Sequence, residues 1–133
     1  MITVDLAAVR NRIKTNLADA IHGLEVYDYE PKTPHHPIAV VAWPTNLNPR
    51  ATQAGDIDVT IPVRFEVVWL GDESSDQALM DLMEAAVNAI ESDRDLNGNV
   101  DDLSCGPFTD IGARTLNDDR VVMQFVVPVE ILA

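Results

Sequence analysis

The sequence predicts an α+β domain: a mostly antiparallel sheet with two helices packed on it, in the order α-β-β-β-α-β-β. Three observations point to this class. Strand-like segments come in runs before and after one central helical segment, and do not alternate singly with helices. The apolar fraction of 47% and the mean hydropathy of 0.00 are typical of a globular chain. The length suits one core, so residues 1–133 are expected to form a single domain.

Residues 4–21 have the spacing of an amphipathic helix, with apolar side chains recurring every three or four positions. Thr3 is expected to cap the N-terminus, and Asp5 then lies in the first turn, where the helix dipole favours a carboxylate. Gly23 is a natural stop signal after the last turn. The predicted buried stripe consists of Leu6, Val9, Ile13, Leu17, Ala20 and Leu24.

Three strands are expected before the second helix. Residues 26–29 form a short one, and the nearly continuous apolar run at 38–43 is typical of a strand buried on both faces. Residues 44–56 are rich in turn formers and predict a long loop. Residues 57–70 alternate apolar and polar side chains, as a strand with one buried face does. Because Pro62 has no N–H to donate, this strand should lie at a sheet edge or bulge there.

The second helix is expected at residues 74–92. Ser74 and Gln77 have the spacing of a capping box at its start. Its apolar stripe faces the core, and the opposite face carries carboxylates at the same helical spacing. We interpret that acidic face as Asp81, Glu84 and Glu91.

The C-terminal third predicts a weak strand at 100–103, an irregular loop at 104–113, and a hairpin of strands 114–116 and 120–132. The last strand contains Pro128. Two long strands that are each interrupted by a proline suggest that their ends leave the parent sheet. Such ends could pair with a neighbouring subunit.

The chain is strongly acidic, with nine basic and 22 acidic residues and a net charge of -13. Residues 1–50 are balanced, so the whole excess lies in residues 51–133. Non-specific nucleic-acid binding is not expected, because it requires clustered Lys and Arg to neutralise phosphates. The acidic surface is either a solvated face or a surface that repels DNA or meets a basic partner. No apolar run is long enough for a membrane span, and we expect a soluble protein without a secretory signal.

One segment resembles the first half of a calcium loop. Asp93, Asp95 and Asn97 stand at alternate positions before a glycine, and Asp101 could add an oxygen ligand. Position twelve, where the loop requires a bidentate Glu, is Ser104. The alternative, which we favour, is a helix end followed by an Asn-Gly turn, with no metal.

No sequence motif indicates catalysis or a cofactor, so we expect a protein that is not an enzyme. His35 and His36 are adjacent in an extended segment, where their rings would point apart, and a solvated loop is the favoured interpretation. The lone Cys105 excludes an internal disulfide and is expected to be an inert thiol. Trp43 and Trp69 are expected to serve core or interface packing.

Three segments, at residues 26–31, 37–41 and 96–102, together with the size and element order, resemble tail terminator (tail completion) proteins of long-tailed bacteriophages. The resemblance implies a virion protein made in the host cytoplasm. It would form a homohexameric ring at the head–tail junction, where it caps the tail tube, ends tube polymerisation and binds the head connector or stopper protein. DNA would pass through the ring without specific binding.

In such a ring, the two predicted loops are large enough to become ordered against a partner. The acidic face of the second helix could line the DNA channel. The expected interface positions are Asn46, Asn48, Arg50, Gln53, Phe108, Asp110 and Arg114.

Two alternatives remain open from the sequence. One is another neck component, such as a stopper or head-completion protein. The other is a monomeric acidic module that binds calcium or acts as an inhibitor. The mass of the protein in solution separates these classes, since a ring former assembles and a monomeric module does not.

Overall fold

The computed structural model describes residues 5–32, 34–47, 59–116 and 118–132. Two helices and seven strands are present in these ranges. They are α1 (Leu6–Ala20), β1 (Glu25–Tyr27), β2 (Ile38–Val41), β3 (Asn46–Leu47), β4 (Val59–Val68), α2 (Glu73–Glu91), β5 (Asp102–Cys105), β6 (Thr109–Thr115) and β7 (Val121–Leu132).

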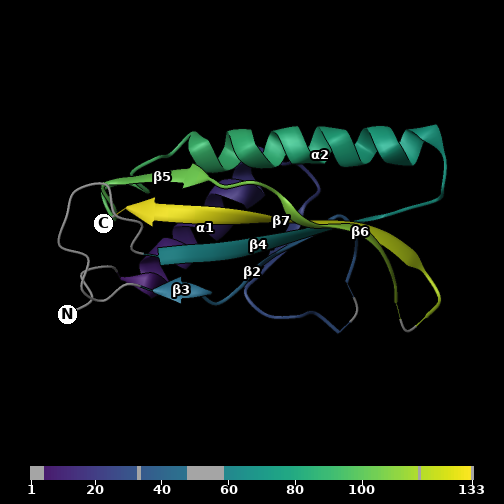
Figure 1. Ribbon diagram of the computed structural model, residues 1–133, viewed down its shortest axis with the longest axis horizontal. Helices are drawn as coiled ribbons and strands as arrows, with labels where there is room; N and C mark the ends of the chain where they lie inside the picture. The colour runs from purple at the N-terminus through teal and green to yellow at the C-terminus, as the bar shows by residue number, and fades with distance from the viewer. Residues whose placement is uncertain (1–4, 33, 48–58, 117, 133) are drawn as a thin grey trace.

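All of these strands belong to one sheet, in the order β1-β2-β4-β7-β5. β3 pairs with β4, and β6 pairs with β7. Only the β1–β2 pair is parallel among the described strands. Both helices contribute to the core on one face of the sheet, with α2 running along the β5–β7 side (Figure 1). The predicted α+β class and the mostly antiparallel sheet are therefore confirmed.

The core lies between the helices and one face of β4 and β7. The alternation that the sequence predicts for β4 is confirmed, because Val63 and Phe65 are fully buried and the Arg64 side chain between them points to the other face. The rings of Phe65 and Phe125 stack with centroids 4.9 Å apart. Burial of one such side chain stabilises the fold by about 1.5–3 kcal/mol. The α1 stripe that packs here consists of Val9, Ile13 and Leu17.

The N-cap of each helix lies two positions away from the residue that the sequence predicts. Asp5, and not Thr3, is the N-cap of α1, and its carboxylate accepts from the backbone of Ala8 at 3.2 Å. Asp72 caps α2, so Ser74 lies inside the helix. An aspartate competes with serine and threonine as N-cap, and its charge adds a favourable interaction with the helix dipole.

The two prolines lie opposite each other in the middle of the sheet. Pro62 pairs with Pro128 within a ladder that runs unbroken from Val59 to Val68, so neither strand leaves the sheet there. The carbonyl of Pro62 accepts from the Ala42 amide between β2 and β3, and that of Pro128 accepts from the Gly106 amide between β5 and β6. The predictions of an edge, a bulge and departing ends are wrong. Each proline faces an interruption in the outer strand, where no ladder donor is needed.

The predicted loop at 104–113 is largely strand. Its end forms β6, which is bulged between Thr109 and Gly112 and has Asp110 at a φ of 54°. The bulge breaks the period-two pattern on which the sequence prediction depended. The predicted hairpin to the last strand is confirmed, and Leu116 donates to the carbonyl of Arg120 across it at 2.8 Å.

Candidate functional site

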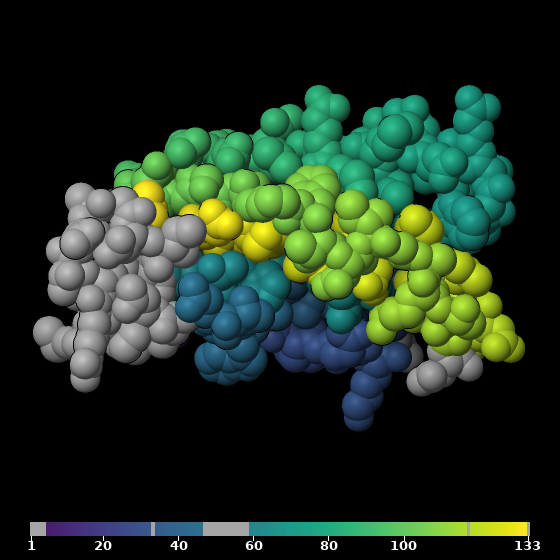
Figure 2. Space-filling model, in the orientation of Figure 1, coloured from purple at the N-terminus to yellow at the C-terminus, as the bar shows by residue number. Residues whose placement is uncertain are grey.

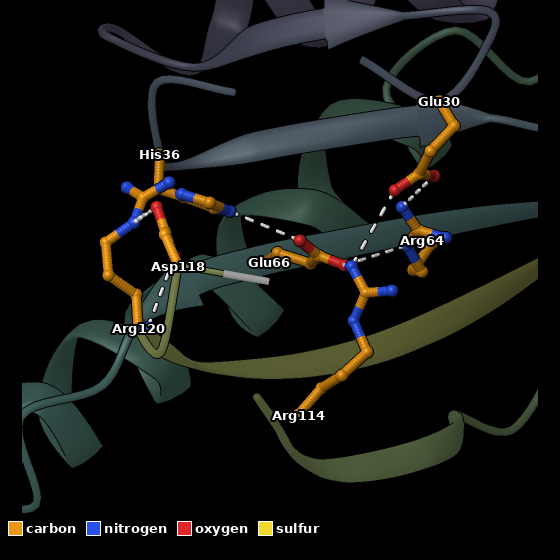
Figure 3. Close-up of polar contacts among 7 residues, drawn as sticks. All are labelled: Glu30, His36, Arg64, Glu66, Arg114, Asp118 and Arg120. Atoms are coloured by element: carbon orange, nitrogen blue, oxygen red, sulfur yellow. Dashed lines mark hydrogen bonds and ion pairs between the residues drawn. The ribbon is translucent and has the colours of Figure 1, made fainter. Parts of the chain in front are cut away.

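A buried carboxylate organises the face of the sheet that the helices do not cover (Figure 3). Alternation along β4 places Arg64 and Glu66 on this face. The Glu66 side chain is only 1% exposed. Its Oε2 accepts from Nη2 of Arg114 at 2.6 Å and lies 3.1 Å from Nε of Arg64. Its Oε1 lies 3.2 Å from Nε2 of His36.

The connection between β1 and β2 closes over this network. Glu30 forms an ion pair with Arg64, and its other oxygen lies 3.7 Å from the Arg114 guanidinium. The charges of two carboxylates and two guanidiniums therefore balance each other. These groups belong to β4, to β6 and to the β1–β2 connection. A buried charge is tolerable only with such partners.

His36 differs from its neighbour. Its side chain is 1% exposed, so the prediction of a solvated loop is wrong at this position, whereas His35 is exposed as predicted. In the neutral imidazole, donation from Nε2 to Glu66 leaves Nδ1 as an acceptor. That nitrogen is buried and has no partner among the described residues. The sequence gives no signal for this burial, because the partner is 30 residues away.

A cleft of about 560 Å³ opens beside the network, between the β1–β2 connection and the β6–β7 hairpin. Three bases line it in a chain that has only nine, and two acids accompany them. Arg120 pairs with Asp118, two residues before it, at 2.7 Å between β6 and β7. The charged lining consists of Glu30, Lys32, Arg114, Asp118 and Arg120.

The first carboxylates of the candidate calcium segment, residues 93–101, bind other groups of the protein. Asp93 accepts from Nε of Arg12 and from Nδ2 of Asn16, both at 2.8 Å, which joins the end of α2 to α1. These bonds from Arg12 and Asn16 hold the pKa of Asp93 below its usual value. The backbone amide of Asn97 donates to the carboxylates of both Asp93 and Asp95 at 3.2 Å. The carboxylates thus bind the protein's own donors.

The backbone after these carboxylates forms a tight turn. Leu96, Asn97 and Gly98 have φ values of 47°, 57° and 87°. Asp101 is exposed beyond the turn and does not approach Asp93 to form a ligand set. Within the described ranges, no group of three His, Cys, Asp or Glu side chains could hold a metal ion. The backbone geometry agrees with the predicted helix end and Asn-Gly turn.

The structure describes four of the seven expected interface positions, and they have different surroundings. Phe108 stacks on Phe125 at 5.3 Å and is partly buried, and Arg114 is bound to Glu66, so neither is a free loop residue. Asp110 is exposed at the β6 bulge, and Asn46 lies in β3. The remaining three positions lie outside the described residues: Asn48, Arg50 and Gln53.

The acidic face of α2 is smaller than predicted. Asp81 and Glu84 are exposed, and Asp81 accepts from Gln77 at 2.8 Å. Glu91 instead accepts from the backbone of Cys105 at 3.1 Å, which joins α2 to β5. Burial, and then the nearby Glu91 charge, raise the pKa of Cys105 to about 12. This agrees with the predicted inert thiol.

Several large apolar side chains are exposed, and the sequence singles out only Trp43 among them, for core or interface packing. Alternation and helical spacing identify the side chains that point into the core. They do not identify which surface side chains become buried when the protein binds a partner. Arg10 lies over the Trp43 ring, 4.6 Å from its centroid. The exposed fractions are Tyr29 67%, Trp43 70%, Val68 38%, Leu70 76%, Met80 54% and Ile111 55%.

Comparison with known proteins adds no assignment. No protein-family model matches the chain, and no curated protein matches it significantly. Neither helix in the described ranges is long and apolar enough to cross a membrane.

Proposed function

We propose that this chain is a structural virion protein that caps the tail tube of a long-tailed bacteriophage as a hexameric ring. It ends tube polymerisation and joins the tail to the head connector or stopper protein. The six-fold number comes from the sequence resemblance. The structural observation that carries the proposal is a set of large exposed apolar side chains that belong to, or directly follow, several different strands and helices.

A ring subunit needs several contact surfaces at once: one for each neighbour, one for the tube and one for the connector. Tyr29 and Trp43 follow β1 and β2, whereas Met80 and Ile111 belong to α2 and β6. Leu70 follows the C-terminal end of β4. Exposed apolar groups of this kind are typical of protein–protein contacts. Their separation favours a protein with several partners over one with a single ligand.

The sheet provides a firm base for such contacts. The central pair of β4 and β7 is paired over ten residues, and the Glu66 network ties β6 and the β1–β2 connection to it. A scaffold of this kind keeps surface positions fixed when several copies assemble.

The two alternatives differ in support. Another neck component would use the same surfaces and is separated only by its position in the particle. The monomeric calcium module has less support, because Arg12 and Asn16 bind the Asp93 carboxylate.

The test is assembly on tail tubes. The purified chain is mixed with polymerising tube protein, and tube lengths and tube ends are examined by electron microscopy. We expect shorter tubes with a ring on the end. Tubes of unchanged length and bare ends would contradict the proposal. Labelling of intact particles would then decide between the terminator and another neck component.

A further inference from the structure

The molecule has two different sides, defined by the ends of the sheet (Figure 1). α1 packs on β1 and β2, and we call this the α1–β1 side. α2 packs on β5, β7 and β4 and also against α1, and β6 is the other strand that pairs with β7 on this edge. We call this the α2–β6 side. Among the described residues, β1 pairs only with β2 and β6 pairs only with β7. β1 and β6 are therefore outer strands at opposite ends of the strand order, although the β1–β2 connection crosses the uncovered face of the sheet and reaches Arg114 of β6.

The α1–β1 side presents aromatic rings and bases. Tyr29 and Trp43 are exposed, and Arg10 lies over the Trp43 ring. The Arg10 guanidinium also donates to the carbonyls of Asp28 at 3.1 Å and Val41 at 2.8 Å, so the cation is fixed over the Trp43 ring. Helix α1 carries three bases and one acid: Arg10, Arg12, Lys14 and Asp19.

The α2–β6 side presents the complementary chemistry. Met80, Met83 and Val87 of α2 line an apolar groove of about 400 Å³ together with Phe108. Ile111 is exposed on β6, which pairs with β7 at the same end of the strand order as β5. Figure 2 shows α2 and the β6–β7 hairpin as the two projecting parts at one end of the molecule. Helix α2 carries five acids and no base: Glu73, Asp76, Asp81, Glu84 and Glu91.

We infer that the α1–β1 side of one copy docks on the α2–β6 side of the next copy. Aromatic side chains would enter the apolar groove, and the basic helix would lie beside the acidic one. Tyr, Trp and Arg are the residue types that most often anchor interfaces. Because the two sides are different surfaces, the contact is heterologous and repeats from copy to copy, as a ring requires.

A second copy is favoured as the occupant by charge. Copies with a net charge of -13 repel each other unless the contact brings opposite charges together. The α1–α2 pairing does so, since α1 has a net positive and α2 a net negative charge. The Arg12–Asp93 ion pair between α1 and the end of α2 within one copy already uses this chemistry.

Side-chain packing, and not strand pairing, should dominate the contact. β6 begins with a bulge at which Asp110 has a positive φ, and bulges and charges protect an edge strand from strand addition. The inference rests on the proposed function, which supplies the ring. It adds which surfaces of each copy form the contact between neighbours.

Charge exchange tests the inference. Lys14→Glu and Glu84→Lys should each weaken self-association about tenfold, the effect of about 1.4 kcal/mol. The double variant carries both exchanges and should recover most of the loss. Asp101→Lys is the matched control, because it makes the same charge change as Glu84→Lys at an exposed position that does not line the groove. Sedimentation velocity over a concentration series measures assembly, and thermal unfolding confirms the fold.

A second variant addresses the apolar part. Ile111→Asp places a carboxylate at the exposed surface of β6 and should abolish assembly while the melting temperature stays unchanged. If these variants weaken assembly no more than Asp101→Lys does, the inferred docking surfaces are wrong. The proposed ring itself is then not contradicted. Wild-type protein that remains monomeric, even with tube protein present, overturns both. Assembly that the charge and Ile111 variants weaken, but that leaves tube length unchanged, supports the inference and contradicts the proposed tail function.

Discussion

Arg114 reaches across β7 to bind Glu66, with Nη2 and Oε2 2.6 Å apart. The two residues are 48 positions apart and belong to strands that do not pair with each other. The contact therefore clamps the outer strand β6 to the centre of the sheet. Arg64 and His36 complete the surroundings of the same carboxylate.

Glu66→Ala should lower the free energy of unfolding by about 3–5 kcal/mol, because it leaves charged and polar partners without their carboxylate. Urea denaturation of the monomer at low concentration measures this. Asp101→Ala removes an exposed carboxylate instead and should change the stability by less than about 0.5 kcal/mol. Equal effects of the two variants would show that the network contributes no net stability.

Asp93 predicts how stability depends on acid pH. Hydrogen bonds from Arg12 and then Asn16 lower its pKa in the folded state from an ordinary value of 3.8. Its contribution is therefore present above the unfolded pKa and is lost as the pH falls through the folded pKa. The melting temperature measured from pH 6 to pH 2 should fall less for Asp93→Asn than for the wild type. Parallel curves for the two proteins would contradict this linkage.

Calcium should not stabilise the protein. The carboxylate of Asp93 already binds donors from α1, and Asp95 binds the turn backbone. Thermal unfolding with and without millimolar calcium should therefore give the same melting temperature, since only binding to the folded state raises it. A rise that saturates with calcium, and that Asp95→Asn abolishes, would restore the calcium-binding interpretation.

The helices and long strands could be predicted because their patterns are local. The alternation along β4 and the stripe of Val9, Ile13 and Leu17 depend only on which side chains leave water. The position of Pro62 could not be predicted, since its tolerance depends on a gap between β2 and β3 that only the assembled sheet defines. Residues 109–113, the first part of β6, escaped prediction because the bulge disrupts the alternation there.

The candidate surfaces were less predictable than the fold. Glu66 reads as an ordinary outward side chain of an alternating strand, and nothing local shows that His36 and Arg114 cover it. Glu91 fits the acidic helical face by spacing, but its length lets it turn to the Cys105 amide. The exposure of Trp43 depends on the packing around Arg10, which brings together distant segments.

Cys105 should react slowly in the folded protein. Burial and the Glu91 charge raise the pKa of its thiol to about 12, so almost none of it is thiolate at pH 8. The rate of reaction with a disulfide reagent should rise strongly in urea. Glu91→Gln removes the second cause and should increase the folded-state rate only modestly, because burial is the larger cause. A folded-state rate equal to that in urea would contradict the burial of this thiol.

The acidic face of α2 has two candidate roles that one double variant can separate. Asp81→Asn with Glu84→Gln removes both exposed carboxylates and keeps Glu91, which binds the Cys105 amide. If the face meets α1 of the next copy, self-association weakens at low salt. The difference from wild type then vanishes at about 1 M salt, where the Debye length is about 3 Å. Particles that still form should eject DNA normally.

If the face lines the DNA channel instead, assembly stays unchanged and ejection slows, because duplex adheres more to a neutral wall. Sedimentation over a salt series and a timed ejection assay on the same variant therefore give opposite patterns for the two roles, and the docking surfaces inferred above require the first.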